Sequence, residues 1–213
     1  MITAWMFYRL LNIIYYFGND MKKELSKMST AELGKLFPIK IVEFNPSWSK
    51  YFEQEKEYIL NILESEGVQR VVHFGSTAIT GMAAKPSIDI LVEIPDNNEI
   101  RNRIIDKMIT NGYQHMKNHP THLMFVKGYT ENGYDEICYH IHMGTKDEEQ
   151  LWERIYFKDY LTANPSVAEE YSDLKYKLAR LHEFDREAYT EAKSDFIKSI
   201  TLIAKDKKLH KPH

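Results

Sequence analysis

A Gly-Ser pair and a downstream aspartate form the segment of this sequence that is best suited to chemistry. Gly75 and Ser76 follow the apolar residues 71–74, and Asp89 lies within the next apolar run, 87–94. Glycine lets the backbone approach a ligand closely, and N–H groups in such a turn can hold phosphate oxygens. A carboxylate on the adjoining strand could hold a divalent cation against those phosphates. This order of strand, loop and strand with an acid predicts phosphoryl or nucleotidyl chemistry.

Two histidines extend the set of candidate ligands. Residues 136–143 are predicted to form a strand, on which the period of two puts His140 and His142 on the same face. The same alternation directs Asp89 away from the isoleucines of its own strand. The histidine pair is suited either to metal or phosphate contact or to hydrogen bonding with the backbone in a half-buried position. Both interpretations stay open, and Asp89 itself could instead cap a loop.

Further polar residues could contact a bound phosphate. Thr77 follows Ser76 directly, and Lys85 lies in the loop before the acid-bearing strand. Thr77 is equally suited to stabilising the turn, and exposure to solvent is the default for Lys85. Predicted helices carry four candidates to line the mouth of a cleft and compensate substrate charge: Arg154, Lys158, Lys175 and Lys193. Of these, Arg154 and Lys193 are singled out. Most charges on such helices simply face water.

Predicted helices and strands around these residues indicate an α+β protein. Strands are expected over residues 39–44, 68–74, 87–94, 113–116, 121–127 and 136–143. Helices are expected over residues 30–36, 45–67, 97–112, 149–161, 164–181 and 185–200. The chain accordingly divides into an N-terminal extension (1–30), an α/β core (31–145), a helical region packed on the core (146–204) and a tail (205–213).

Composition narrows the class of protein. The 213 residues carry 28 Lys and Arg against 31 Asp and Glu, a formal net charge of −3. This near balance argues against an extended nucleic-acid surface, which usually needs a basic excess. Cys138 is the single cysteine, so an internal disulfide and a multi-cysteine zinc site are excluded. We therefore expect a cytoplasmic protein.

Residues 2–17 are strongly apolar and aromatic, which is unusual for such a start. They fall short of the roughly 20 residues that a transmembrane helix needs, and Arg9 and Asn12 interrupt them. They also lack the basic start and the small-residue cleavage site of a signal peptide. The favoured interpretation is a dispensable extension with synthesis starting at Met21 or Met28. An extra packed helix and, least favoured, membrane contact are the alternatives.

The string HFGSTAITGMAAKPSIDILVEI at residues 73–94 resembles the signature of the GrpB family. The resemblance continues through HIHMG at 140–144 and then FKDYLTANP, EEYSDLKYKLA and DREAYTEAKSDFI, so that it covers roughly residues 33–200. It implies the fold of the nucleotidyltransferase superfamily, which is the DNA polymerase β-like palm. A mixed β-sheet flanked by helices, followed by a C-terminal helical bundle, is the architecture that this resemblance predicts.

The resemblance also implies a set of site residues. Nucleotidyltransferases of this superfamily carry a Gly-Ser pair, then two carboxylates one residue apart, and a third on a later strand, and these carboxylates bind metal ions. Gly75-Ser76 matches the pair and Asp89 the second carboxylate, whereas Ser87 stands at the first and His140 at the third. Mixed donors put ordinary transfer with two Mg²⁺ ions in doubt, because imidazole suits Mn²⁺, Zn²⁺ or Fe²⁺ better.

The function implied is metal-dependent transfer of a nucleotidyl group from a nucleoside triphosphate to a small-molecule acceptor. Asp89 and His140 would be catalytic and, with His142, would hold Mg²⁺ or Mn²⁺. No aromatic stacking platform for nucleic acid is evident. A degenerate module that binds a nucleotide or another phosphate ligand is one alternative, and a metal-dependent hydrolase is another. The acceptor, the preferred base and the oligomeric state are left open.

Overall fold

The computed structural model describes residues 28–116 and 122–209. The three interpretations of residues 2–17 therefore lie outside the described residues, as does most of the proposed N-terminal extension. Among the residues that are described, no helix combines the length and the apolar character that a membrane span requires.

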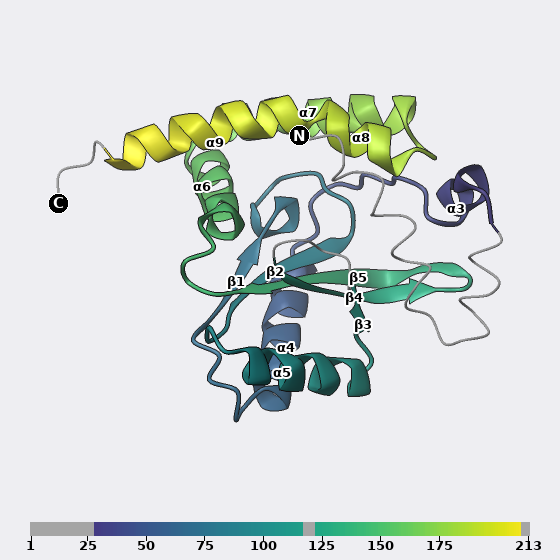
Figure 1. The fold of residues 1–213 in the computed structure, drawn as a ribbon. Helices are drawn as coiled ribbons and strands as arrows, with labels where there is room; N and C mark the ends of the chain where they lie inside the picture. Colours follow the sequence, from purple (N-terminus) through teal and green to yellow (C-terminus); the bar gives the residue numbers. More distant parts are fainter. Residues whose placement is uncertain (1–27, 117–121, 210–213) are drawn as a thin grey trace.

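A five-stranded mixed sheet forms the centre of the fold (Figure 1). Its strands, in spatial order, are β1 (Arg70–Phe74), β2 (Ser87–Glu93), β5 (Gly133–Gly144), β4 (Leu123–Thr130) and β3 (Gln114–His115). Strands β2 and β5 are parallel, and the other neighbours are antiparallel. The predicted α+β class with a mixed sheet flanked by helices is confirmed.

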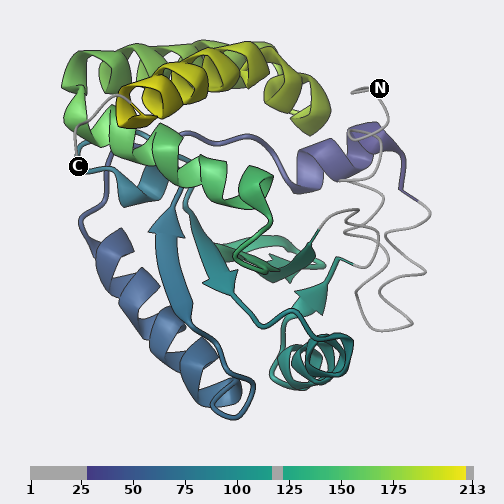
Figure 2. The same ribbon diagram turned by 60° about the vertical axis from the view of Figure 1, so that its left-hand side comes forward.

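Helices cover both sides of this sheet (Figures 1 and 2). Below it in Figure 1 lie α4 (Ser47–Ile62) and α5 (Asn98–Thr110). On the other side lie α6 (Glu149–Ala163), α7 (Pro165–Leu181), α8 (Arg186–Ala192) and α9 (Ser194–Leu209), with α3 (Thr30–Leu36) toward one end of the sheet. The four C-terminal helices thus form one wall opposite the sheet.

Strand alternation decides which face of the sheet is apolar. Ile88, Ile90 and Val92 on β2 are fully buried in the main core, where they pack with residues such as Ile59 of α4 and Ile104 of α5. Burying aliphatic side chains of this size stabilises the fold by about 1.5–3 kcal/mol each. Because successive residues of a strand point to opposite faces, the remaining side chains of β2 face the C-terminal helices.

Two predicted elements differ from the structure. The strand expected over residues 39–44 is wrong, since this segment makes only an isolated bridge between Val42 and Ala84. The helix expected over 185–200 is divided at Lys193, the C-cap of α8, before α9 begins. Helix α9 continues to Leu209, so much of the segment expected to be a frayed tail from residue 205 is helical.

Candidate functional site

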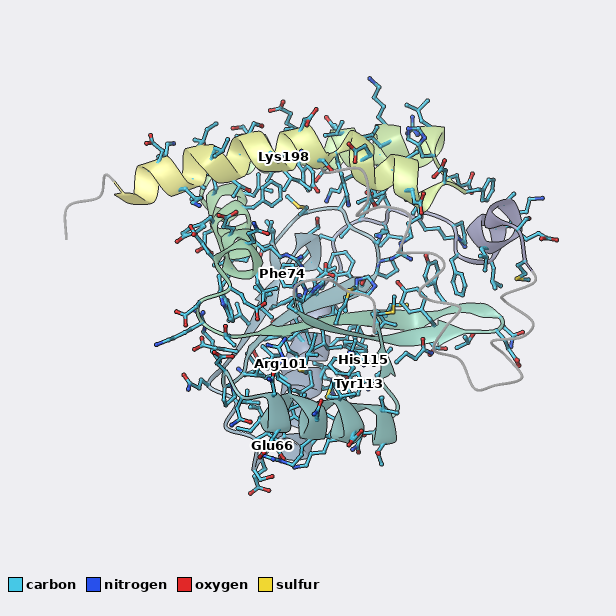
Figure 3. The ribbon with its side chains drawn as sticks, in the orientation of Figure 1. Glu66, Phe74, Arg101, Tyr113, His115 and Lys198 are labelled. Carbon is cyan, nitrogen blue, oxygen red and sulfur yellow. The ribbon has the colours of Figure 1, made fainter. Side chains whose placement is uncertain are left out.

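A cavity of about 610 Å³ lies between the sheet and the C-terminal helices. Its lining includes Phe74 at the end of β1 and Lys198 on α9. Figure 3 shows both of these residues on the side of the sheet that faces α9, whereas Tyr113 lies on the side of α5. The size falls in the range of roughly 300–1,000 Å³ that small-molecule sites occupy.

The Gly75-Ser76 turn forms one edge of this cavity. Gly75 has φ of +74°, and a Cβ atom placed on it would overlap Oδ2 of Asp89. Ser76 begins the short 3₁₀ helix η2 (Ser76–Ala78) and lines the cavity. The buried Thr77 donates its hydroxyl proton to the carbonyl oxygen of Ser87 at 3.0 Å, a bond that holds the turn against β2. The absence of a side chain at Gly75 therefore lets the turn lie against the carboxylate of Asp89.

Asp89 and His140 meet on neighbouring strands. They are register partners in the parallel β2–β5 pair, and Nδ1 of His140 lies 2.9 Å from Oδ1 of Asp89. The hydroxyl of Ser87 is 3.1 Å from the same nitrogen. The structure thus brings these three residues together, although they are distant in the sequence.

The other ring nitrogen of His140 also takes part in a hydrogen bond. Nε2 lies 2.7 Å from the hydroxyl of Tyr129, which in turn accepts a hydrogen bond of 3.0 Å from Arg186. An ionised carboxylate can only accept, so Nδ1 of His140 carries the proton and Nε2 accepts from Tyr129. Neither Tyr129 nor Arg186 was among the sequence-based candidates.

Burial sets the charge states of this pair. It lowers the pKa of His140 to about 4, although the hydrogen bond to Asp89 opposes the change. Burial is also the largest single influence on Asp89 and raises its pKa, but the hydrogen bond and charge of His140 together with the charges of Lys85 and Lys193 outweigh it, so the pKa lies below its ordinary value. At neutral pH the site therefore holds a neutral imidazole and an ionised carboxylate.

The donors present do not form a metal centre by themselves. Across residues 28–116 and 122–209, no three His, Cys, Asp or Glu side chains are grouped so that they could hold an ion. Both nitrogens of His140 are already hydrogen-bonded, so binding a metal would break one of these bonds. The expected mixed Asp/His centre does not fit this arrangement, and the hydrolase alternative, which needs such a centre, has no support from it.

His142 contacts a different set of residues from His140. Its Nδ1 lies 2.7 Å from Nε2 of His122 and 3.1 Å from Nη1 of Arg154 on α6. The ring is also packed edge-on against Phe74 and is almost completely buried. Arg154 lines the cavity, and His142 is well placed to orient this arginine.

Cationic side chains dominate the ionisable groups around the cavity. Two carboxylates, Asp89 and Glu153, line it. The cationic residues that line it are Lys85, Arg154, Lys175, Arg186, Lys193, Lys198 and Lys205. In a chain whose overall charge is negative, this local excess of seven cations over two carboxylates is suited to a polyanion.

Lys175 on α7 is the most deeply buried of these cations, at 2% exposure. Its Nζ donates to Oγ of Ser76 at 3.0 Å and to the carbonyl oxygen of Ala83. Burial, with a smaller contribution from Lys193, lowers the pKa of Lys175 to about 7. The burial of Lys175 is indicated by the sequence, because Tyr171 lies four residues before it and Leu178 three residues after it. These spacings put all three residues on the same face of the helix.

Comparison with known proteins places these residues in a family context. The family model described as GrpB protein matches residues 38–202. YqkA, a UPF0157 protein of Bacillus subtilis, is 31% identical over 169 residues, which are 78% of this chain and 47% of YqkA. This chain therefore spans about half the length of that relative.

Comparison with solved structures also finds a GrpB protein. The crystal structure of the conserved protein GrpB from Enterococcus faecalis aligns with a TM-score of 0.71 and 29% identity, over 80% of this chain and all of that chain. Cid1 in complex with its short product ApU overlaps far more weakly. That alignment has a TM-score of 0.44 and 14% identity, over 63% of this chain and 40% of Cid1.

Proposed function

This chain belongs to the GrpB family, and we propose that it binds a phosphorylated ligand of nucleotide size in the cavity between the sheet and α6–α9. The observation that carries this proposal is the convergence of seven Lys and Arg side chains, of which Lys175 is only partly protonated at neutral pH, on a cavity with two carboxylates. Phosphate oxygens accept charge-assisted hydrogen bonds from Lys and Arg, and these are among the stronger hydrogen bonds in proteins.

The phosphate end of the ligand is assigned to the Gly75-Ser76 turn. Glycine at this turn leaves the backbone accessible, and Lys175 approaches Oγ of Ser76 from the helical wall. Lys193 is close enough to Lys175 to lower its pKa, so the amines of both residues adjoin the same place. A phosphate there would accept hydrogen bonds from Lys193 and, in either protonation state, from Lys175.

Calorimetric titration of ATP and tripolyphosphate tests this assignment. We expect both to bind and adenosine to bind far more weakly, because the cations recognise the phosphates. Lys193→Met should weaken ATP binding about tenfold, the loss expected when one charge-assisted hydrogen bond is removed. Lys177→Met is the matched control, since Lys177 is exposed on α7 and does not line the cavity.

Two results would contradict phosphate binding. One is the absence of heat with ATP, GTP and tripolyphosphate, each tested alone and with Mg²⁺ or Mn²⁺. The other is equal affinity for adenosine and ATP, which would mean that the cations do not recognise the ligand.

Nucleotidyl transfer to a small-molecule acceptor is the second candidate function. The specific observation in its favour is the ionised carboxylate of Asp89, which is held by His140 directly beside the Gly75-Ser76 turn. A fixed negative charge at this place could orient an acceptor hydroxyl or a cation that accompanies the phosphates. Asp89 is also the residue that we expect, from the sequence resemblance, to correspond to a carboxylate of nucleotidyltransferases.

Asp89→Asn tests transfer separately from binding. The amide oxygen of asparagine can still accept from Nδ1 of His140, so the fold should survive while the negative charge is lost. If Asp89 acts in transfer, we expect release of pyrophosphate from ATP to fall by about a hundredfold or more, as when a positioned catalytic group is removed. Unchanged release in this variant would eliminate the role of Asp89 in transfer.

A further inference from the structure

We propose that Ser76 is a nucleophile activated by Lys175, so that group transfer in this cavity passes through a covalent bond between phosphorus and the serine oxygen. The substrate class is a phosphoric anhydride such as a nucleoside triphosphate. This inference rests on the proposed binding of a phosphorylated ligand and assigns a chemical step to the same site.

The geometry of Ser76 is that of an accessible hydroxyl on a sharp turn. The residue follows β1 immediately after Gly75 and lines the cavity. Its side chain is fixed from the helical wall, because Nζ of Lys175 lies 3.0 Å from Oγ. The amine donates in this bond when it is protonated, and once neutral it can accept from the hydroxyl of Ser76. The latter is the arrangement that activates serine in Ser-Lys enzymes.

Lys175 is placed to act as the base. Its amine is held by the carbonyl oxygen of Ala83 as well as by Ser76, so its position does not depend on solvent. Burial and the neighbouring Lys193 lower its pKa to about 7, and a substantial fraction of the amine is therefore neutral at physiological pH. A neutral amine has a lone pair that can take the hydroxyl proton.

The other titratable groups on the floor of the cavity are less suited to this task. The pKa of Asp89 lies below its ordinary value, which makes its carboxylate a weak base. His140 has both ring nitrogens in hydrogen bonds, to Asp89 and Tyr129. Of these three residues, Lys175 is the one with both a suitable pKa and direct contact with a hydroxyl.

The proposed transfer has two halves. Oγ of Ser76 forms a bond to phosphorus while the bond between that phosphorus and the bridging oxygen of the anhydride breaks. The leaving phosphate or pyrophosphate takes the electron pair of the broken bond, and the hydroxyl proton moves to Nζ of Lys175. An acceptor hydroxyl or water then attacks the phosphorus and releases its proton to solvent. The electron pair of the broken phosphorus–oxygen bond returns to Oγ of Ser76, which takes its proton back from Nζ of Lys175. The ammonium formed in the first half also offsets the charge developing on the phosphate oxygens.

A fluorophosphonate probe tests the nucleophile directly. It reacts with activated serines by forming an oxygen–phosphorus bond and expelling fluoride, so it needs neither an acceptor nor a known substrate. The full-length protein is incubated with the probe, the adduct is measured by intact-mass spectrometry and located by peptide mapping, and ATP binding is measured calorimetrically on the same samples. Thermal unfolding of each variant checks that it is folded.

We expect one adduct on Ser76. It should be absent in Ser76→Ala and form about a hundredfold more slowly in Lys175→Met, because removal of a general base costs at least this factor. Matched controls on the same helix, Ser172→Ala and Lys177→Met, should react as the unsubstituted protein does, since neither residue lines the cavity. In the unsubstituted protein, the labelling rate should rise with pH through about 7, where the base loses its proton.

The outcomes separate the two proposals. ATP binding without modification of Ser76, or modification that is equally fast in Lys175→Met, overturns the nucleophile and leaves phosphate binding intact. A labelling rate that does not change between pH 6 and pH 8 also overturns it. Modification of Ser76 that depends on Lys175 in a protein that binds neither ATP nor tripolyphosphate supports the nucleophile and counts against the proposed ligand class.

Discussion

Gly75→Ala is expected to lower the free energy of unfolding by about 2–6 kcal/mol and to abolish binding of phosphorylated ligands. Part of the loss is backbone strain, because Gly75 has φ of +74° and ψ of −174°, a conformation that is essentially restricted to glycine and costs another residue about 1–3 kcal/mol. The remainder is steric, since the added Cβ would overlap Oδ2 of Asp89 and lie 3.1 Å from its Cβ and Cγ. Asp89 could move away only by weakening its hydrogen bond with His140, at a cost of about 1–3 kcal/mol. Urea unfolding and ATP titration measure the two effects.

Gly81→Ala is the matched control for this experiment. Gly81 has φ of +79°, nearly the same as Gly75, but a Cβ there would meet no atom within 4 Å. We expect this variant to lose only the strain contribution of roughly 1–2 kcal/mol and to bind ATP normally. Equal losses of stability in the two variants would show that contact between residue 75 and Asp89 does not matter.

The placement of Asp89 could be predicted because it depends on local periodicity. Ile88, Ile90 and Val92 occupy every second position of the strand. This period of two is sufficient to assign the two faces of the strand. The structure confirms that these three aliphatic side chains are fully buried. An acid on the opposite face, away from these aliphatic side chains, is therefore a candidate site residue.

The neighbours of Asp89 could not be predicted in the same way. Its contact with His140 depends on the parallel pairing of β2 with β5, which joins segments about fifty residues apart. Tyr129 and Arg186 enter through a further strand and a helix. Neither carries a local pattern that distinguishes it from an ordinary tyrosine or surface arginine, so only tertiary structure identifies the hydrogen-bonded chain.

The failed strand over residues 39–44 has a physical cause. Its alternating apolar residues are typical of a strand, but Ile39 packs with Leu178 and Tyr189 of the C-terminal helices instead of entering the sheet. Burial by helices satisfies the same hydrophobic pattern as burial in a sheet. Tertiary packing therefore overrides the local preference for pairing.

Lys175→Met is expected to produce the largest change in how the free energy of unfolding depends on pH. The pKa of Lys175 falls from 10.5 to about 7 in the folded protein, a destabilisation of roughly 4–5 kcal/mol when the amine is charged. Methionine has a similar length and no charge, but it forfeits the hydrogen bonds to Ser76 and Ala83. We expect the variant to be about 2 kcal/mol more stable than the unsubstituted protein at pH 6 and to bind ATP at least tenfold more weakly.

The stability advantage of Lys175→Met should shrink as pH rises. Between pH 7 and 10.5 the unfolded chain holds a proton on Lys175 that the folded protein lacks, so stability of the unsubstituted protein increases with pH in this window. The difference between the two proteins should accordingly fall by about 2–3 kcal/mol from pH 6 to pH 9, as measured by urea unfolding. Lys177→Met, on the exposed side of the same helix, should follow the unsubstituted protein at every pH. A constant difference across this range would mean that Lys175 stays charged in the folded protein, and the site would then hold a permanent cation at Ser76 in place of a base.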